Sequence, residues 1–436
     1  PSRLKAPMKR VGPRGSGEFE EISWEEALSI ATEWLAPIRE EDPSKLAFFT
    51  GRDQSQSFTS LWAQGFGTPN YAAHGGFCSV NMAAAGIYTM GGAFWEFGAP
   101  DWERTKMFMI FGVAEDHDSN PIKMGLGRLK ARGAKVVGVN PVRSGYNAIA
   151  DEWVGITPGT DGLFILAMIH ELLKAGKVDV GYLNRYTNAT YLVNQDEASD
   201  EHGLFIKGED GKPLVWDPAS NSAVAFDTAN VKPAMQGDFT VNGVPGKPVF
   251  ELLAAKYADE KYAPEAVSER CGVSVETIKR LAAELAHTAF EEEIVVDQPW
   301  TDFRGMKHDK MIGRPVSFHA MRGISAHSNG FQTCRALHML QILLGSVECP
   351  GGFRFKPPYP KPVEAHPPPH HTSEPGGTLD GPHLGYPRGP ENLALDEDGN
   401  AKRIDKAYTW EHPMSAHGLM HMVISNAHAG DPYKID

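Results

Sequence analysis

The chain has 436 residues, of which 41% are apolar and 22% are charged, a balance typical of a folded globular protein rather than a disordered or fibrous one. Lys and Arg number 42 against 55 Asp and Glu, and the net charge of −13 argues against nucleic acid or an anionic membrane surface as a partner. No apolar run is long enough to span a bilayer, so we expect no direct membrane insertion.

The four cysteines lie far apart and form no CxxC pair: Cys78, Cys271, Cys334 and Cys349. This spacing argues against a disulfide scaffold, a zinc ribbon, or an iron–sulfur cluster held by these residues alone. If the chain binds a metal, we expect that metal to take few protein ligands.

The first predicted elements are a helix and then a strand, loop and helix. Ser23 can cap a helix that continues to Ile38, with acidic residues in its first turn and apolar residues at helical spacing. A short buried strand is predicted over 46–50. The polar loop 51–55 then leads into a helical stretch over 57–65.

Strands and helices then alternate between residues 106 and 175. The predicted strands cover 106–111, 135–139 and 153–157, and the predicted helices cover 121–132 and 163–175. Buried apolar strands that alternate with helices indicate a doubly wound parallel sheet, so the predicted fold class is α/β.

The rest of the chain is less regular. Helical periodicity returns over 262–289 and 333–344, with a buried strand predicted over 294–297, whereas the Pro-, Gly- and His-rich stretch 349–390 has no period. The predicted regions are an N-terminal connecting segment (1–45), a first α/β region (46–190), an insertion of loops and hairpins (191–250), a second α/β region (251–348), and a Pro/Gly/His-rich loop with the start of a following region (349–436).

The stretch 67–79 ends in Cys78, which follows a Gly-Gly pair where the backbone can approach a bulky group. A soft thiolate there suits a soft or high-valent metal, and the alternative is a buried structural cysteine.

Polar loops also follow the predicted strands, at 51–55, 112–120, 140–144 and 158–161. Because ligands bind at the carboxyl ends of parallel strands and helix N-termini bind phosphates, these loops predict a long ligand with several phosphates. Each loop taken singly is compatible with ordinary turn chemistry, and none matches a dinucleotide or P-loop motif.

Five motifs in one order carry a family resemblance. They are Gly67-Thr-Pro-Asn70 with His74 and Cys78, Asp118-Ser-Asn-Pro-Ile122, Asn140-Pro-Val-Arg143 followed by Ala150-Asp-Glu-Trp153, Pro158-Gly-Thr-Asp161, and the segment Gly323–Gly330. In this order the chain resembles the DMSO reductase family of molybdopterin oxidoreductases over nearly its whole length. The alternative, an unrelated Rossmann-type binding protein, would make the five motifs coincidental.

The resemblance implies a pair of molybdopterin guanine dinucleotides whose four dithiolene sulfurs hold molybdenum or tungsten, with Cys78 as the protein ligand. Both α/β regions would then bind the cofactor. The implied catalytic residues are His74, Cys78, Arg322 and His327. The implied cofactor-binding residues are Arg52, Asp53, Gly76, Gly112, Asp118, Ser119, Asn140, Pro141, Arg143, Gly159, Asp161, Gly323, Asn329 and Gly330.

Among these residues, Asn140 departs from the family's more usual Asp and is expected to bind a ribose hydroxyl without a charge. Arg322 and His327 are candidates for a cationic substrate pocket, although an Arg beside a helix is more often a salt-bridge partner. The metal itself needs one protein ligand, since the pterin sulfurs supply the others.

Two segments known from the family are not among these residues. They are an N-terminal four-cysteine segment for a [4Fe–4S] cluster and a C-terminal cofactor-capping domain, so we expect a piece of a longer polypeptide and leave the cluster open. Six histidines of the C-terminal part are interpreted as exposed loop residues rather than a second metal site: His366, His370, His371, His383, His417 and His421.

Within the family, residues 71–92 and 112–117 are similar to the molybdoprotein subunit of membrane-associated sulfite dehydrogenases. The predicted activity is therefore oxidation of sulfite, a small oxyanion, to sulfate. Electrons would leave through a ferredoxin-like iron–sulfur subunit to a membrane-anchor subunit and on to quinone, with the chain cytoplasmic and peripheral at the inner membrane.

Three alternatives to sulfite oxidation stay open. The first is reduction of polysulfide, thiosulfate or tetrathionate. The second is formate oxidation, although Ser79 follows Cys78 where the formate enzymes place His. The third is a non-catalytic scaffold homologue, which would hold no metal.

Overall fold

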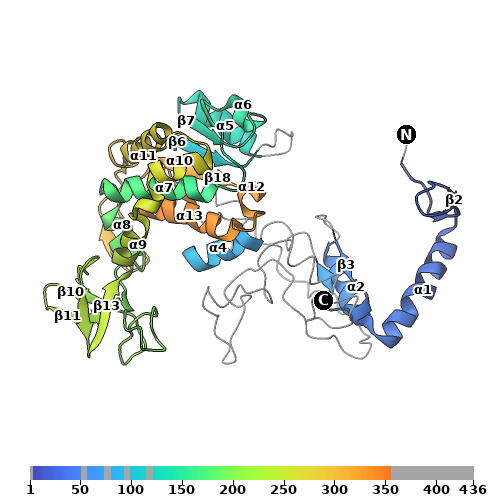
Figure 1. Cartoon of the computed structure of the whole chain (residues 1–436), viewed down its shortest axis with the longest axis horizontal. Coiled ribbons are helices and arrows are strands. Elements are labelled where there is room, and N and C mark those ends of the chain that lie inside the picture. The colour runs from blue at the N-terminus through green and yellow to red at the C-terminus, as the bar shows by residue number, and fades with distance from the viewer. Residues whose placement is uncertain (1–2, 51–55, 73–79, 93–98, 114–120, 355–436) are drawn as a thin grey trace. The chain divides into compact units, whose positions relative to one another are not determined.

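The computed structural model describes residues 3–50, 56–72, 80–92, 99–113 and 121–354, which belong to two compact units (Figure 1). The first unit includes the described residues up to Val80, and the second includes those from Asn81 to Arg354. The elements of the first unit are β1 (Met8–Arg10), β2 (Phe19–Glu21), α1 (Trp24–Glu41), η1 (Pro43–Lys45), β3 (Phe48–Phe49), α2 (Gln56–Phe66) and β4 (Tyr71–Ala72).

Helix α1 begins where the sequence predicts and ends three residues later. Its N-cap is Ser23, whose Oγ accepts a hydrogen bond from the backbone N–H of Glu26 at 3.1 Å. None of its residues is fully buried, and Trp34 is 74% exposed. The apolar stripe that includes Ile30, Leu35 and Ile38 is half-buried within the described part of its unit.

The strand predicted over 46–50 is shorter than expected and is not buried. It consists of β3, which pairs in parallel with the two-residue strand β4, and Phe49 is 41% exposed. The prediction of a buried strand here was wrong because, among the described residues, β3 pairs only with this short strand and belongs to a separate two-stranded sheet.

The second unit is built on a parallel sheet of four strands in the order β18-β6-β7-β8. Their bounds are β6 (Met107–Phe111), β7 (Lys135–Val139), β8 (Glu152–Val154) and β18 (Val316–Ala320). All three pairings are parallel, with Met107 opposite both Val316 and Lys135. The predicted α/β class with a parallel sheet is confirmed.

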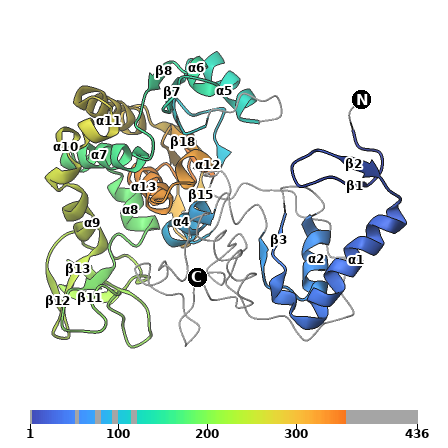
Figure 2. The same ribbon diagram turned by 45° about the vertical axis from the view of Figure 1, so that its right-hand side comes forward.

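Alternate side chains of β6 pack on opposite faces of this sheet. Phe108 and Ile110 join the core that contains Leu126 of α5 (Pro121–Ala131), whereas Phe111 contacts Phe164 of α7 (Asp161–Lys174) with ring centroids 6.4 Å apart. Figures 1 and 2 show α5 and α6 (Tyr146–Ile149) on one side of the sheet and α7, α11 (Val275–Phe290) and α13 (Gly330–Leu343) on the other. The sheet is therefore doubly wound.

Strand β18 lies next to β6, so segments from both predicted α/β regions contribute to one sheet. Two sequence-based expectations for the second half of this unit need correction. The buried strand predicted over 294–297 is β14 (Ile294–Val296), which pairs antiparallel with β17 (Met311–Gly313) and has Val295 51% exposed. The helical stretch 262–289 is interrupted between α10 (Pro264–Cys271) and α11 by Gly272, whose φ of 73° ends α10 in the left-handed region.

The segment between residues 191 and 250 forms short antiparallel strands. They are β9 (Leu192–Asn194), β10 (Leu214–Asp217), β11 (Ser222–Ala225), β12 (Phe239–Val241) and β13 (Val244–Pro248). Strands β12, β13 and β9 form one sheet, and β10 pairs with β11. A small core that includes Leu192, Leu214 and Val241 holds them together, with Trp216 stacked on Phe239 at 4.6 Å between ring centroids.

The remaining elements of the second unit are α4 (Val80–Met90), β5 (Ala99–Pro100), α8 (Val180–Tyr186), α9 (Val249–Tyr257), η2 (Glu260–Tyr262), β15 (Trp300–Thr301), β16 (Lys307–His308), α12 (Arg322–Ser325) and β19 (Phe353–Arg354). None of the helices in the described ranges is long and apolar enough to cross a membrane.

Candidate functional site

The carboxyl ends of the four parallel strands meet at one edge of the sheet, and the loops that follow them form the candidate site. From β6 the chain adds β7 and then β8 on one side, and it later adds β18 on the other side of β6. The direction of winding therefore reverses between β18 and β6. In open α/β sheets the crevice at such a reversal is where ligands bind.

Two predicted glycines touch at this reversal. Gly112 follows β6 with a φ of +63°, and a Cβ built on Gly323, after β18, would lie 2.1 Å from the carbonyl oxygen of Gly112. No other residue type fits at Gly323 without a backbone shift. The segments after β6 and β18 therefore meet backbone to backbone at this edge, with no side chain between the two glycines.

The loop after β8 is bound to the segment that precedes α13. Asn329 donates a hydrogen bond from Nδ2 to the carbonyl oxygen of Gly159 at 2.9 Å. Asp161, the first residue of α7, is 6% exposed, and its burial raises the pKa of the carboxyl while the nearby His327 opposes that rise. The structure thus brings four predicted site residues together at the start of α7.

Asn140, the predicted ribose ligand at the end of β7, is 7% exposed and shapes its own turn. Its Oδ1 accepts the backbone N–H of Val142 at 3.0 Å, and its carbonyl oxygen accepts the indole N–H of Trp153 at 2.9 Å. These bonds account for the Asn-Pro-Val-Arg and Asp-Glu-Trp segments lying side by side. Pro141 and Arg143 are exposed beside this turn.

Arg322 is exposed at the same edge, as the first residue of α12. Among the described residues, neither Arg322 nor Arg143 has a carboxylate at ion-pair distance. The salt-bridge alternative considered for Arg322 therefore finds no partner in this part of the chain. Two unpaired guanidinium groups at one edge favour binding of an anion.

Asn81 was missed by the sequence analysis. It lies in the first turn of α4, three residues after Cys78, and is 5% exposed. Its Nδ2 donates to the carbonyl oxygen of Ser325 at 2.7 Å and approaches that of His327 at 3.5 Å. Asn81 therefore fixes the start of α4 to the segment that leads into Gly330. A lone amide near the start of an otherwise apolar, small-residue helix was the available signal.

Asn147 on α6 was missed as well. Its Nδ2 donates to the carbonyl oxygen of Val113 at 3.2 Å, directly beyond Gly112. A Cβ at Gly138 would lie 2.4 Å from Asn147 Oδ1, so a glycine in β7 makes room for this side chain. Asn147 therefore holds the start of the loop after β6 by this hydrogen bond, a role that its place on a four-residue helix did not reveal.

Seven predicted site residues lie outside the described residues: Arg52, Asp53, His74, Gly76, Cys78, Asp118 and Ser119. The six C-terminal histidines lie outside them too. Within the described ranges, no group of three or more His, Cys, Asp or Glu side chains is arranged to hold a metal ion.

Known proteins resemble this chain over most of its length. A family model described as molybdopterin oxidoreductase matches residues 3–386. A sulfite dehydrogenase subunit of Allochromatium vinosum is 49% identical over 451 aligned residues, which cover 100% of this chain and 46% of that protein. The molybdopterin-containing subunit of thiosulfate reductase from Salmonella typhimurium is 34% identical over 43% of this chain and 24% of that protein.

Among solved structures, acetylene hydratase from Pelobacter acetylenicus aligns with a TM-score of 0.49 and 18% identity, covering 79% of this chain and 36% of that one. The chain spans less than half of the length of the curated relatives named above. Because the family model matches most of the chain and one relative is 49% identical over all of it, the chain belongs to the molybdopterin oxidoreductase family.

Proposed function

We propose that this chain is part of the catalytic subunit of a molybdenum enzyme that oxidises sulfite to sulfate. The observation that carries the proposal is the 49% identity with the sulfite dehydrogenase subunit of Allochromatium vinosum over the whole chain. The contact between Gly112 and Gly323 at the reversal of the sheet supports it, because both glycines are among the predicted cofactor-binding residues.

The described residues fit a large pterin dinucleotide. A ligand of that size needs close backbone approach at its diphosphate, and the contact between Gly112 and Gly323 leaves no side chain in the way. The buried carboxyl of Asp161 suits the N–H donors of a guanine base. We propose that Asn140 and Arg143 bind the nucleotide end, and that His327, Asn329 and Gly330 lie against a pterin.

We propose Cys78 as the one protein ligand to the metal, with His74 close to it. The bound cofactor would supply the two-electron redox chemistry that sulfite oxidation needs. The protein's own contribution is to hold the dianion, and the exposed Arg322 has no competing carboxylate within the described residues. Its guanidinium would bind sulfite at the crevice and replace part of the hydration shell of the anion.

The test uses the purified full-length protein that contains this chain. We expect molybdenum with about two guanine dinucleotides per metal, as two pterins per metal would require. We also expect sulfite-dependent reduction of an artificial electron acceptor. Cys78→Ala should abolish this activity, since it removes the proposed metal ligand.

Cys349→Ser is the matched control. Cys349 lies by the start of β18, at the opposite edge of the sheet, where its Sγ accepts the backbone N–H of Arg314 at 3.3 Å. Serine preserves an acceptor at that place, so activity and metal content should stay close to wild type. Protein that contains neither molybdenum nor pterin would overturn the proposal in favour of a non-catalytic homologue.

Reduction of thiosulfate or a related sulfur compound is the second candidate. It is favoured by the 34% identity with the thiosulfate reductase subunit, which covers 43% of this chain. Protein that holds molybdenum, is inert to sulfite and oxidises a reduced dye with thiosulfate would establish this alternative. Activity with formate, and with neither sulfur compound, would instead identify formate as the substrate.

We further propose partner subunits, because one relative is named as a subunit of its enzyme and another as a molybdopterin-containing subunit. The partners proposed are a ferredoxin-like iron–sulfur subunit together with a membrane-anchor subunit that passes electrons to quinone. The guanine dinucleotide form of the cofactor, a [4Fe–4S] cluster and a cytoplasmic position at the inner membrane rest on the family resemblance. Co-purification of the full-length protein from membranes tests the partners directly.

A further inference from the structure

A cavity of about 850 Å³ lies within the 81–354 unit, and its lining includes neither Gly112 nor Gly323. Helices α4, α8, α9 and α13 border it, together with the loop between β15 and β16. Exposed residues line part of it, including Lys256 and Phe303, which is 79% exposed, so the cavity opens to solvent. Its volume is in the range of small-molecule sites.

Flat aromatic side chains form much of the wall. The rings of Tyr182 and Tyr186 on α8 have centroids 5.5 Å apart, and Phe303 continues the row at 6.0 Å from Tyr186. Burial raises the pKa of Tyr182 above its ordinary value, so its hydroxyl stays protonated and neutral. Such a wall favours a ligand with a flat apolar body.

The charges around the cavity are mostly positive, although the chain as a whole carries −13. Glu348 is the one carboxylate among the described residues that line it, against Arg185, Lys256, Arg304 and Arg335. Arg185 is neutralised by Asp302, with Nε 2.9 Å from Oδ2. Arg304 donates to the carbonyl oxygens of Arg185 at 3.2 Å and Phe226 at 2.6 Å and has no described carboxylate at ion-pair distance, although Asp227, outside the cavity lining, is close enough to interact with its charge.

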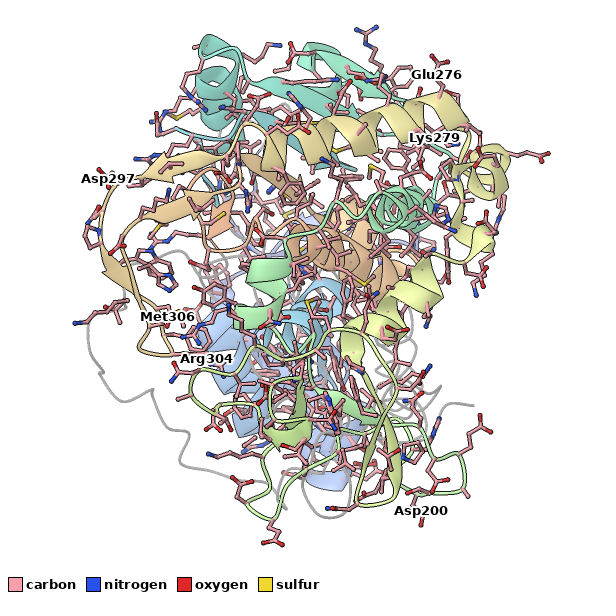
Figure 3. The ribbon with its side chains drawn as sticks, turned by 90° about the vertical axis from the view of Figure 1, so that its left-hand side faces the viewer. Asp200, Glu276, Lys279, Asp297, Arg304 and Met306 are labelled. Carbon is pink, nitrogen blue, oxygen red and sulfur yellow. The ribbon has the colours of Figure 1, made fainter. Side chains whose placement is uncertain are left out.

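Figure 3 shows Arg304 on the loop between β15 and β16 beside Met306, and it shows Glu276 and Lys279 on α11 at the top of the view. Lys256 lies at the end of α9, with Nζ 5.6 Å from the ring centroid of Tyr257 and no carboxylate at ion-pair distance within the described residues. Arg304 and Lys256 thus bring positive charge from two separate elements, a loop and a helix.

Arg335 on α13 is the least compensated of these cations. Its Nη1 donates to Gln332 Oε1 at 2.9 Å and its guanidinium lies 5.8 Å from the ring centroid of Phe331, but its buried Nε has no hydrogen-bond partner among the described residues. No described carboxylate pairs with it. Burial lowers the pKa of Arg335, which reflects the cost of a guanidinium with so little neutralising contact.

We propose that this cavity binds a small organic anion with a flat apolar or aromatic body, with its acidic group on Arg335 and Lys256. The aromatic wall of α8 would receive the body, and the two cations would neutralise the acidic group. A neutral ligand of the same shape would leave Arg335 without a counter-charge, so the site selects for charge as well as for shape.

The cavity is connected to the candidate site through two helices. Tyr88 and Arg335 line the cavity, whereas Asn81 and Gly330, at the beginnings of the same helices α4 and α13, border the crevice. At 1.5 Å per residue, the five positions from Gly330 to Arg335 correspond to roughly 8 Å along α13. The anion site therefore lies beside the crevice without sharing its loops.

The test is a binding measurement on the full-length protein without substrate, so its outcome does not depend on the proposed sulfite oxidation. The probe is 8-anilinonaphthalene-1-sulfonate, a flat aromatic sulfonate, and its neutral counterpart is N-phenyl-1-naphthylamine. We expect saturable binding of the sulfonate at one site. Arg335→Gln should weaken it about tenfold, the size expected for one charge-assisted contact, and should change binding of the neutral probe far less.

Three further variants separate the proposal from simple apolar binding. Arg335→Lys should restore most of the affinity for the sulfonate, and Lys256→Gln, at an exposed position that is safe for folding, should weaken it by about threefold. Arg128→Gln on α5, which removes an exposed ion pair with Glu103, should leave the affinity for the sulfonate unchanged. Absence of saturable binding, or equal loss of both probes in Arg335→Gln, would overturn the proposal.

Discussion

The two edges of the parallel sheet differ in how their charges are partnered. At the amino ends of the strands, Lys135 Nζ lies 2.9 Å from Glu152 and also pairs with Glu284 of α11, and Arg280 pairs with both of these carboxylates. At the carboxyl ends, Arg143 and Arg322 have no carboxylate partner among the described residues. The sheet thus has a network of paired charges at one edge, and at the other edge it has cations without a carboxylate partner among the described residues.

This difference separates charges that hold the fold from charges that are available to a ligand. A charge that is already paired offers little to an incoming anion, whereas an unpaired cation beside the crevice gains its counter-charge only on binding. Removal of a paired charge should therefore lower stability, and removal of an unpaired one should lower affinity. The predictions that follow test this separation, beginning with the largest effect.

Asp302 is the most buried of the paired charges, with a side chain 1% exposed. It accepts from Arg185 Nε at 2.9 Å and from His308 Nε2 at 3.0 Å, and it also accepts the backbone N–H of Arg304 at 2.9 Å. Asp302→Ala should lower the free energy of unfolding by about 3 kcal/mol, since it leaves a partly buried guanidinium unpaired. Urea unfolding measures this loss, and Asp309→Ala, an exposed neighbour, is the control.

The same carboxylate predicts a pH dependence. The guanidinium of Arg185 holds the pKa of Asp302 well below its usual range. Its stabilising effect is therefore complete above the ordinary Asp pKa of about 4 and is lost as the pH falls toward the lower pKa of the folded state. The stability difference between wild type and Asp302→Asn should narrow below about pH 4. A difference that is constant between pH 3 and pH 7 would contradict this assignment.

Gly323→Ala should have the next largest effect, and it acts on the open edge. The added Cβ would lie 2.1 Å from Gly112 oxygen, so the β6 and β18 loops must separate. We expect pterin content to fall and sulfite oxidation to drop about a hundredfold, because a misplacement of about 1 Å has that cost for the rate in positioned sites. Gly127→Ala on α5 is the control, since a Cβ there meets nothing within 4 Å. Normal pterin content in Gly323→Ala would show that the crevice is not part of the cofactor site.

Asn81→Ala should have a moderate effect on both stability and cofactor content. It removes the 2.7 Å hydrogen bond to Ser325 and leaves a buried carbonyl oxygen without this donor, at a cost of about 1–2 kcal/mol. Asn184→Ala removes a comparable 2.9 Å bond from Asn184 to the carbonyl of Pro233 in another part of the unit. Both variants should lower the melting temperature, but only Asn81→Ala should lower pterin content. Equal pterin content in the two would reduce Asn81 to a structural residue.

Much of the fold followed from the sequence, because local periodicity determines the elements that dominate it. The β6 and β7 strands and the α5 and α7 helices are apolar segments with clear boundaries, and Ser23 caps α1 as predicted. Strand order was not predictable, since nothing local states that Val316–Ala320 inserts beside Met107–Phe111. Strand β14, which is partly exposed, was predicted to be buried because three consecutive β-branched residues are typical of a buried strand.

For the site, the sequence supplied the loops and the family but not the contacts between the loops. The close approach of Gly323 to Gly112 joins segments that are 211 positions apart, and the bond from Asn81 to Ser325 joins residues 244 positions apart. Such contacts depend on strand order, which the sequence left open. Cys78 and the other residues outside the described ranges keep their assigned roles as predictions.

The smallest expected effects come from a pair of exposed arginines at the two edges. Arg322→Gln should raise the KM for sulfite about fivefold and weaken its dependence on salt, because it removes an unpaired cation from an exposed position where solvent screens much of its charge. The melting temperature of this variant should stay unchanged.

Arg280→Gln breaks the ion pairs with Glu152 and Glu284; Arg280 Nη1 lies 2.8 Å from Glu284 Oε1. This variant should lose about 0.5–1 kcal/mol of stability and show no change in the KM for sulfite. Steady-state kinetics and thermal unfolding on both variants give four values. If Arg322→Gln lowered stability and Arg280→Gln raised the KM, the presence of an ion-pair partner would not distinguish structural charges from ligand-binding charges in this protein.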